Sequence, residues 1–282
     1  MPTESDPTVV EATEHPAHSA APATMQVVLR EVPIQRFLID IITVVAMAGF
    51  MAEIAEQGLG MDDPYDVVNM FSLSYERNVP TWLSGTMHVT SAMLLAVIAS
   101  RAHQAGEPFV RHWWGLSAVF AYISLDEFVS LHATMNSWFD FEGVLSFDWV
   151  IPASVLVSIF VLSYLKFLAH LPAITRFRFV RAGAIFVGGA MGVELALAYW
   201  TDLHGSGNLV YALIDWVEET MEMTGAGLFL AANVAVLTNQ TGQLRVVSGA
   251  ADAPMVEVCP DDGDADEVVP GNAPPVSDAD AD

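Results

Sequence analysis

The sequence predicts an all-helical fold, a polytopic membrane bundle of six transmembrane helices with both chain ends in the cytoplasm. Hydrophobic residues make up 53% of the 282 residues, although the formal net charge is -24. Fourteen of the 34 acidic residues lie before Met25 or after Arg245, so the ends of the chain are polar and the middle is apolar. Six apolar segments in that middle reach the roughly 20 residues that an α-helix needs to cross a hydrocarbon core of about 30 Å.

Apolar length and proline positions define these six segments. Proline lacks a backbone N–H, so it is tolerated in the first turn of a helix and ends a helix elsewhere. Segment ends are marked by Pro33, Pro80, Pro108 and Pro172. The predicted helices cover residues 34–56, 81–103, 109–135, 147–170, 179–200 and 208–237.

The two ends of the chain, residues 1–24 and 239–282, are predicted to be disordered acidic tails on either side of a transmembrane domain of residues 25–238. Both are rich in proline, alanine and acidic residues, which leaves too little apolar surface to offset the entropy of folding. Such acidity suits the high-salt cytoplasm of a halophile, and it equally suits an ordinary solubilising tail. No nucleic-acid partner is expected of so acidic a chain. The single cysteine, Cys259, excludes a disulfide within the chain.

The basic residues predict the orientation of the helices. Lysine and arginine residues flank the start of the first helix, the links between helices two and three and between four and five, and the end of the sixth helix. Only Arg77 lies on the other side. By the positive-inside rule, both termini are then cytoplasmic in a multi-pass protein of the plasma membrane. Tryptophans near both boundaries, such as Trp82 and Trp114, are typical of the same arrangement.

Two connecting features carry further expectations. The longest outer loop, residues 58–80, is predicted to contain a short amphipathic helix that acts as a lid over the outer face. In the fifth helix, Gly188 and Gly192 have the GxxxG spacing that lets a neighbouring backbone approach closely. Packing within the chain is the main expectation from this spacing, and a homodimer seam is the alternative.

The sixth segment contains four carboxylates where a membrane helix normally has none. Each ionised side chain near mid-bilayer costs roughly 2.5 to 3.5 kcal/mol, so such residues face the protein interior and find a counter-charge, a proton or a metal. Asp215, Glu218 and Glu222 are spaced i, i+3, i+7 and therefore share one helix face, while Glu219 lies about 100° round from Glu218. In the second helix, Ser84, His88 and Ser91 repeat this spacing.

Ionisable residues of the other helices fall at a similar depth below the outer boundary, at about 1.5 Å per residue. They are His88, Asp126, Glu127, His132 and Glu194, with Glu53 and Glu56 at the rim. Imidazole and carboxylate groups suit Zn, Fe or Mn, so a divalent metal is the expected cofactor. The expected ligands are Glu218, Glu222, Glu127, His88 and His132, with Glu219 and Asp126 as catalytic acid or base and Glu194 and Asp215 as further polar groups.

Three segments of the chain resemble a family of uncharacterised multi-helix membrane proteins from bacteria and haloarchaea. They are Glu76-Arg-Asn-Val-Pro-Thr-Trp82, Ser124-Leu-Asp126-Glu127 with His132 downstream, and Glu218-Glu219 with Glu222-Met-Thr-Gly225. In the pattern of that family a glutamate follows the histidine of the third helix, whereas here Ala133 follows His132. The resemblance covers residues 76–237 and implies which residues matter, but it implies no reaction.

The leading hypothesis for function is therefore a metal-dependent membrane enzyme in which a metal-bound water or a redox metal acts on a lipid-soluble or small substrate. The first alternative is a cation or proton-coupled membrane transporter that uses the same acids. The second is a structural or sensory membrane subunit with a polar core. In each case the partner is the lipid bilayer, and the substrate is an unidentified small molecule, lipid or ion.

Overall fold

The computed structural model describes the backbone of residues 25–29, 31–61, 66–131, 150–238, 244–248 and 256–258. Side chains are described for residues 33–61, 66–131 and 152–238. His132 and most of the two predicted tails lie outside these ranges.

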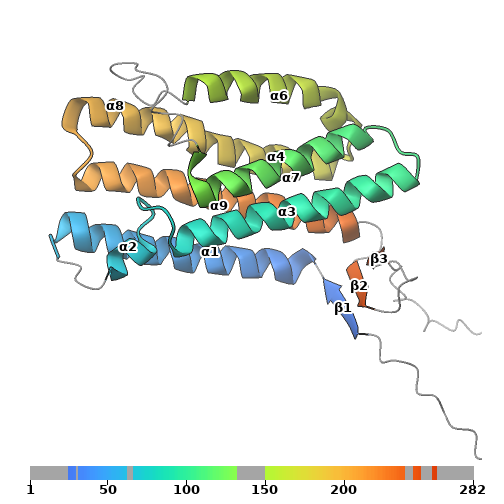
Figure 1. Ribbon diagram of the computed structural model, residues 1–282, viewed down its shortest axis with the longest axis horizontal. Coiled ribbons are helices and arrows are strands. Elements are labelled where there is room, and N and C mark those ends of the chain that lie inside the picture. Colours follow the sequence, from blue (N-terminus) through green and yellow to red (C-terminus); the bar gives the residue numbers. More distant parts are fainter. Residues whose placement is uncertain are drawn as a thin grey trace, which may run out of the picture.

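Within residues 37–237, the described part of the chain consists of helices and the turns that connect them (Figure 1). The π-helices η1 and η3 continue α1 and α7 without a break, so α7, η3 and α8 form one rod. In chain order the helices are α1 (Glu31–Glu53), η1 (Ile54–Gly58), α2 (Val67–Phe71), α3 (Val79–Gln104), α4 (Val110–Val129), α6 (Val150–His170), α7 (Ala173–Val187), η3 (Gly188–Val193), α8 (Glu194–His204) and α9 (Leu209–Thr238).

Five of these rods are long and apolar enough to cross a membrane, which indicates a membrane protein. They are Pro33–Gly58, Val79–Gln104, Pro152–His170, Ala173–His204 and Leu209–Thr238. The predicted third span, residues 109–135, begins with the helix α4, which is not among the five. It ends at Val129, since Ser130 adopts the left-handed conformation that closes its last turn.

The fifth span begins earlier than the sequence predicts. Its rod starts at Ala173, directly after Pro172, rather than at residue 179. Proline fixes a φ angle that suits the entry to a helix, and arginines are tolerated near the end of a membrane helix because their long side chains can reach the interface.

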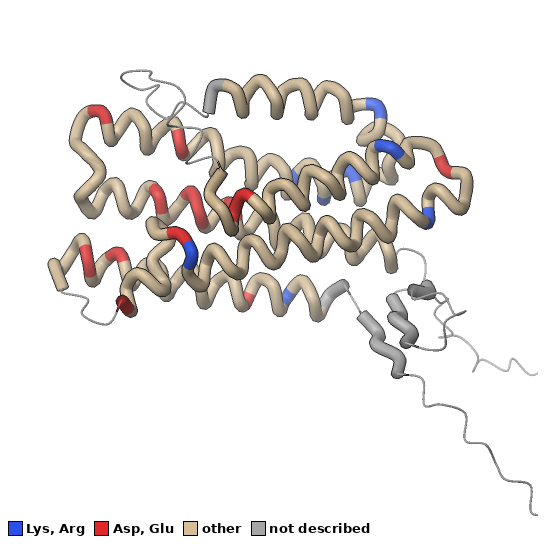
Figure 2. Tube along the Cα trace, in the orientation of Figure 1, with Lys and Arg blue, Asp and Glu red and all other residues tan. Residues whose placement is uncertain are grey.

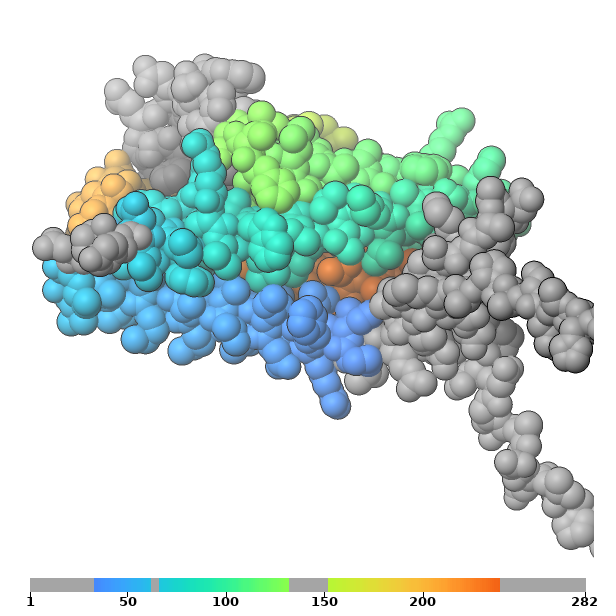
Figure 3. Space-filling view, turned by 60° about the horizontal axis from the view of Figure 1, so that its bottom comes forward, coloured from blue at the N-terminus to red at the C-terminus, as the bar shows by residue number. Residues whose placement is uncertain are grey.

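Successive rods run antiparallel to one another along the bundle, and α9 packs against α1, α3 and α7 (Figure 1). The most extensive helix pair is α3 with α4, where the Ser124 hydroxyl donates to the Gly85 carbonyl at 2.8 Å. Gly225 of α9 packs directly on the α7 backbone. Figure 3 shows α1 and α3 side by side on one face, with part of α9 in the gap between them.

Hydrophobic side chains form two clusters along the bundle. One joins α1, α3 and α9 around Met87, Met223 and Leu230. The other joins α3, α4, α6, α7 and α9 around Phe167 and Phe229. The side chains of α6 are mostly exposed, as expected for a helix that faces lipid.

Short strands flank the helices. Strand β1 (Met25–Leu29), which precedes α1, pairs antiparallel with β2 (Leu244–Ser248), which follows α9, and β2 pairs with β3 (Val256–Val258). This pairing holds the start of α1 and the end of α9 at the same end of the bundle.

Charge is distributed unevenly along the bundle (Figure 2). The end at which α1 begins carries most of the described lysine and arginine residues, and the opposite end carries most of the acids. We call these the basic end and the acidic end. Arg77 is the basic residue at the acidic end, in the turn before α3.

Candidate functional site

The half of α9 at the acidic end lines the candidate site with acidic side chains. Glu218 is 5% exposed, and Asp215, Glu219 and Glu222 are partly buried. Tyr211 precedes them on the same face, since the spacing from Tyr211 to Asp215, Glu218 and Glu222 follows the helical repeat.

Glu218 meets Glu194, the first residue of α8. Both side chains are buried, Glu194 at 7% exposed, and their carboxyl groups lie within hydrogen-bonding reach of each other. An ionised carboxylate only accepts hydrogen bonds, so a hydrogen bond between the two groups requires a proton on one of them. The pair is therefore a candidate proton-binding site.

A glycine in η3 brings these two helices together. A Cβ atom at Gly189 would lie 2.9 Å from the carbonyl oxygen of Glu218 and 3.2 Å from Cγ of Glu222. A Cβ at Gly188 would also meet α9, 3.3 Å from Met221 Cε, whereas a Cβ at Gly192 would meet nothing within 4 Å. The close approach expected of this glycine segment therefore occurs within the chain, and Gly188 and Gly189 provide it.

His88 of α3 lies on the side of the site that faces the basic end. It is 1% exposed, and its ring packs against Phe120 of α4 and Phe186 of α7, with centroids 5.8 and 5.4 Å away. Its Nδ1 is 2.9 Å from the carbonyl oxygen of Ser84. A carbonyl oxygen only accepts, so Nδ1 carries the hydrogen, and Nε2 is a buried acceptor with no hydrogen-bond partner among the described residues.

Glu127 connects α4 to the same place. The Ser84 hydroxyl donates to Glu127 Oε1 at 2.7 Å, and the same oxygen is 3.8 Å from Nδ1 of His88. Glu127 is also close enough to Glu222 for their charges to interact. Glu127 therefore links the imidazole to the carboxylates of α9.

The turn between α2 and α3 covers the acidic end of the site, and we call residues 72–78 the outer strap. Ser72, which is fully buried, donates to Glu53 of α1, and Ser74 hydrogen-bonds Asp215 of α9. The Tyr75 hydroxyl donates to Glu56 at 2.8 Å, and this bond raises the pKa of Tyr75 to about 12.

Asn78 holds the outer strap in shape. Its side-chain amide donates to the carbonyl oxygens of Ser72 at 2.6 Å and Tyr75 at 2.8 Å. Its side-chain oxygen accepts from the backbone N–H of Thr81 at 3.2 Å, which caps α3. The short helix predicted in the outer loop is present as α2, directly before the strap.

The site as a whole is strongly acidic. We call its acids the carboxylate cluster: Glu53, Glu127, Glu194, Asp215, Glu218, Glu219 and Glu222, whose charges interact with one another. The helices α8 and α9 contain no lysine or arginine, and α3 and α4 contain one each, at the basic end. These two basic residues lie at the far end of the bundle from the cluster, so protons or cations must balance its charge.

A family model for a domain of unknown function, DUF8692, matches residues 37–237, which is most of the chain. The chain belongs to the DUF8692 family. No curated protein and no solved structure matches this chain. The DUF8692 region begins in α1 and ends in α9, so it contains the whole carboxylate cluster and the outer strap. This result agrees with the resemblance to an uncharacterised family, while a prokaryotic source and the three motifs stay predictions.

In this DUF8692 protein most of the residues predicted for the site come together. Glu194, Asp215, Glu218, Glu219 and Glu222 form its centre, and His88 and Glu127 adjoin them. Asp126 is partly buried, and its charge also reaches Glu222. Among the described residues, no group of three or more His, Cys, Asp or Glu side chains is placed to hold a metal ion.

Several residues of the site were underestimated from the sequence or missed. Glu53, expected only at the rim, is 1% exposed and interacts with Asp215. The serines of the outer strap were not identified, because nothing in a loop sequence shows which hydroxyl meets a distant carboxylate. Tyr211 was identifiable, since it continues the spacing of the acids in α9.

Proposed function

We propose that this protein translocates protons across the membrane through the carboxylate cluster, with α4 as a sixth membrane-crossing helix and both termini in the cytoplasm. The observation that carries the proposal is the buried contact between the carboxyl groups of Glu194 and Glu218. This pair holds a proton in a part of the membrane where an ionised acid would be costly.

Neighbouring groups provide acceptors on both sides of that pair. Toward the acidic end, Asp215 interacts with Glu194 and is hydrogen-bonded to Ser74 of the outer strap. Its Oδ2 atom is buried and has no partner among the described residues. A proton that leaves the pair can therefore pass to Asp215 and reach water where the strap opens.

In the inward direction, Glu222 follows Glu218 by one helical turn, and its charge interacts with that of Glu127. His88 Nε2 is the next buried acceptor. Beyond it, Ser91 of α3 and Asn233 of α9 are fully buried, and their side-chain polar atoms have no partner in the described part of the chain. Buried polar groups are normally satisfied, so these two positions favour bound water, which can conduct protons toward the basic end.

The test uses the full chain in liposomes that contain a pH-sensitive dye, with a potassium diffusion potential as the driving force. We expect the wild-type protein to acidify the interior, and Glu218→Gln and Glu194→Gln to reduce the rate at least tenfold. Asp40→Asn, which removes an exposed acid at the basic end, is the matched control and keeps the wild-type rate. If liposomes with the wild-type protein acidify no faster than liposomes with Glu218→Gln, the proposal is overturned.

An infrared measurement tests the proton itself. The Glu194 and Glu218 pair should give a carbonyl band of a protonated carboxyl group at neutral pH, and this band should disappear in the Glu194→Gln, Glu218→Gln double variant. A spectrum that is the same in the double variant and in the wild type contradicts the assignment, whatever the flux experiment shows.

The tautomer of His88 favours a second candidate, a metal-dependent enzyme. Metal-binding histidines typically donate one ring N–H to a carbonyl or carboxylate and coordinate through the other nitrogen, and His88 has this arrangement. Iron, zinc or manganese bound at Nε2 would draw on Glu127, Glu222 and Glu218 after side-chain movement, with Glu219 and Asp126 as acid or base. Elemental analysis distinguishes the two candidates, because a stoichiometric metal that His88→Ala loses supports the enzyme.

A further inference from the structure

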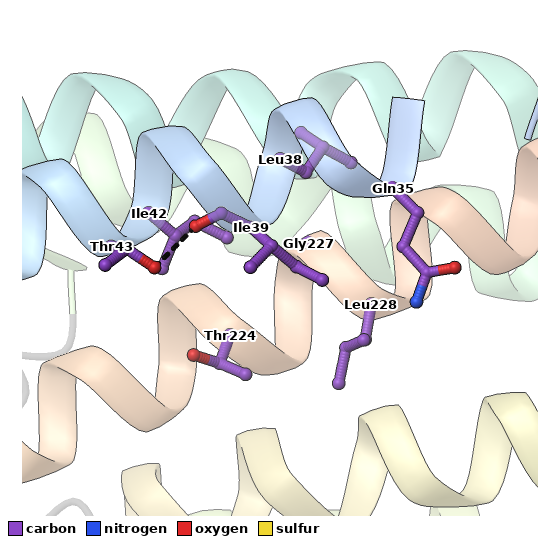
Figure 4. Close-up of a pocket in the computed structure, with 8 residues that line it drawn as sticks. All are labelled: Gln35, Leu38, Ile39, Ile42, Thr43, Thr224, Gly227 and Leu228. Carbon is purple, nitrogen blue, oxygen red and sulfur yellow. Dashed lines mark hydrogen bonds between the residues drawn. The ribbon is translucent and has the colours of Figure 1, made fainter. Parts of the chain in front are cut away.

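A groove separate from the carboxylate cluster runs over α9 between α1 and α7. Both helices pack on α9 and make little contact with each other. Part of the groove is a narrow slot of about 80 Å³, shown in Figure 4. Its walls are mostly apolar, and they include Ile39 of α1 and Thr224, Gly227 and Leu228 of α9.

Glycine at position 227 brings α1 and α9 close together beneath this slot. A Cβ atom at Gly227 would lie 2.6 Å from Ile42 Cδ1. Figure 4 shows Gln35 of α1 and Leu228 of α9 at the same end of the slot. The slot is thus formed by the contact between α1 and α9.

A wider depression of about 450 Å³ continues the slot toward the basic end, and Gln35 lines both. Arg178 and Arg181 of α7 line the depression at i, i+3 spacing, which places them on one helix face. The Arg181 guanidinium lies 5.8 Å from the centre of the Phe177 ring. Among the described residues that line the depression none is acidic, and the residue contributed by α1 is the uncharged Gln35.

We propose that this groove binds an anionic glycerophospholipid. Its phosphate lies against Arg178 and Arg181, and part of one acyl chain occupies the slot between α1 and α9. Guanidinium groups bind phosphate with paired charge-assisted hydrogen bonds, and basic pockets between transmembrane helices recognise anionic headgroups. The first turn of α7 adds backbone N–H groups that no side chain caps, which also favours an anion.

Charge and shape together select this occupant. A zwitterionic lipid would bring its own positive group to a pair of arginines, and a protein segment would need a wider apolar surface than the slot offers. A lipid chain fits the narrow part, and a negatively charged headgroup neutralises the wide part. The bound lipid would hold α1 and α7 against α9, so we expect it to stabilise the bundle.

The experiment measures lipid binding to the detergent-purified full chain by native mass spectrometry, with phosphatidylglycerol and phosphatidylcholine of matched chains as probes. We expect the protein to bind phosphatidylglycerol at least tenfold more tightly. The Arg178→Gln, Arg181→Gln double variant should lose this preference, because each charge-assisted contact contributes about one factor of ten or more.

Two further variants make the test specific. Arg176→Gln is the matched control, since Arg176 donates to the Ala169 carbonyl at 3.4 Å and does not line the depression. It should keep the preference for phosphatidylglycerol. Ile39→Trp, at a half-exposed position, should fill the slot and weaken the binding of both lipids to the same extent. Equal binding of the two lipids by the wild type, or an equal loss in Arg176→Gln and the double variant, would overturn the proposal.

The variants must be folded for this comparison, so gel filtration and thermal unfolding accompany each measurement. Arg178→Lys and Arg181→Lys keep the charge at each position and serve if the glutamine variants do not fold. They should retain a preference for the anionic lipid, with weaker binding because lysine lacks the paired donors of arginine. A complete loss of the preference in these folded variants would contradict a role for the positive charge.

Discussion

Gly225 offers the most direct test of how α7 and α9 hold the carboxylate cluster together. A Cβ atom at Gly225 would lie 2.7 Å from both the Cβ and the backbone nitrogen of Phe186, and 2.9 Å from the carbonyl oxygen of Ala182. Two of these three atoms belong to the α7 backbone, which cannot move aside as a flexible side chain can. Gly225→Ala must therefore push α7 away from α9.

The cost of that substitution can be isolated with a matched control. Alanine favours a helix over glycine by about 1 kcal/mol, and overpacking costs about 1 to 3 kcal/mol. Gly183 of α7 is also helical, but a Cβ there would meet nothing within 4 Å, so Gly183→Ala shows the propensity gain alone. The difference in free energy of unfolding between the two variants is then about 1 to 3 kcal/mol, or roughly 5-fold to 150-fold in the unfolding equilibrium.

The assay is reversible unfolding in mixed micelles with increasing SDS, followed by circular dichroism. We expect Gly225→Ala to unfold at a lower SDS fraction than the wild type and Gly183→Ala at an equal or higher one. If the two variants agree within about 0.5 kcal/mol, the usual effect of a substitution outside the core, then α7 and α9 do not approach as closely as described.

Three further outcomes follow from the site. Ser84→Ala removes the hydroxyl that donates to Glu127 Oε1, and the loss of this hydrogen bond to a partly buried carboxylate should lower the free energy of unfolding by about 1 to 3 kcal/mol in the same SDS assay. Asn78→Ala removes the N-cap of α3 and two further bonds within the outer strap, so we expect a loss of at least about 1 kcal/mol and faster proteolysis of the strap. Tyr75 should hold its proton until about pH 12 instead of the ordinary 10, so its bond to Glu56 contributes stability below pH 10 that is lost as the pH rises through 12. An ultraviolet difference titration of wild type against Tyr75→Phe measures the pKa of Tyr75, and Glu56→Gln should lower that pKa.

Local patterns along the chain were sufficient to predict the helices. Length and apolar composition identified the five membrane-length rods, because a helix satisfies its own backbone hydrogen bonds and depends little on its neighbours. The spacing of the acids in α9 likewise predicted their common face. The sequence places the start of α7 too late, because the predicted span begins after the charged residues Arg176 and Arg178.

Contacts between helices could not be derived in this way. The π-helices η1 and η3 each shift the angular position of the residues that follow, so the standard helical repeat does not predict which way Glu194 faces. Gly188 and Gly189, and not the predicted pair of Gly188 and Gly192, meet α9 for the same reason. The outer strap reaches Glu53 and Asp215 through hydroxyl groups of a turn, which has no repeat from which to predict its contacts.

Periodicity and composition were enough to predict that the chain is helical, that its middle suits a membrane, and that α9 carries a row of acids on one side. The folded structure was needed to show that the carboxyl groups of Glu194 and Glu218 meet, that His88 Nδ1 faces the Ser84 carbonyl, and that Arg178 lines the depression next to the apolar slot. The reason is that helix formation and burial depend on residues a few positions apart, whereas these contacts depend on how whole helices rotate and pack against one another.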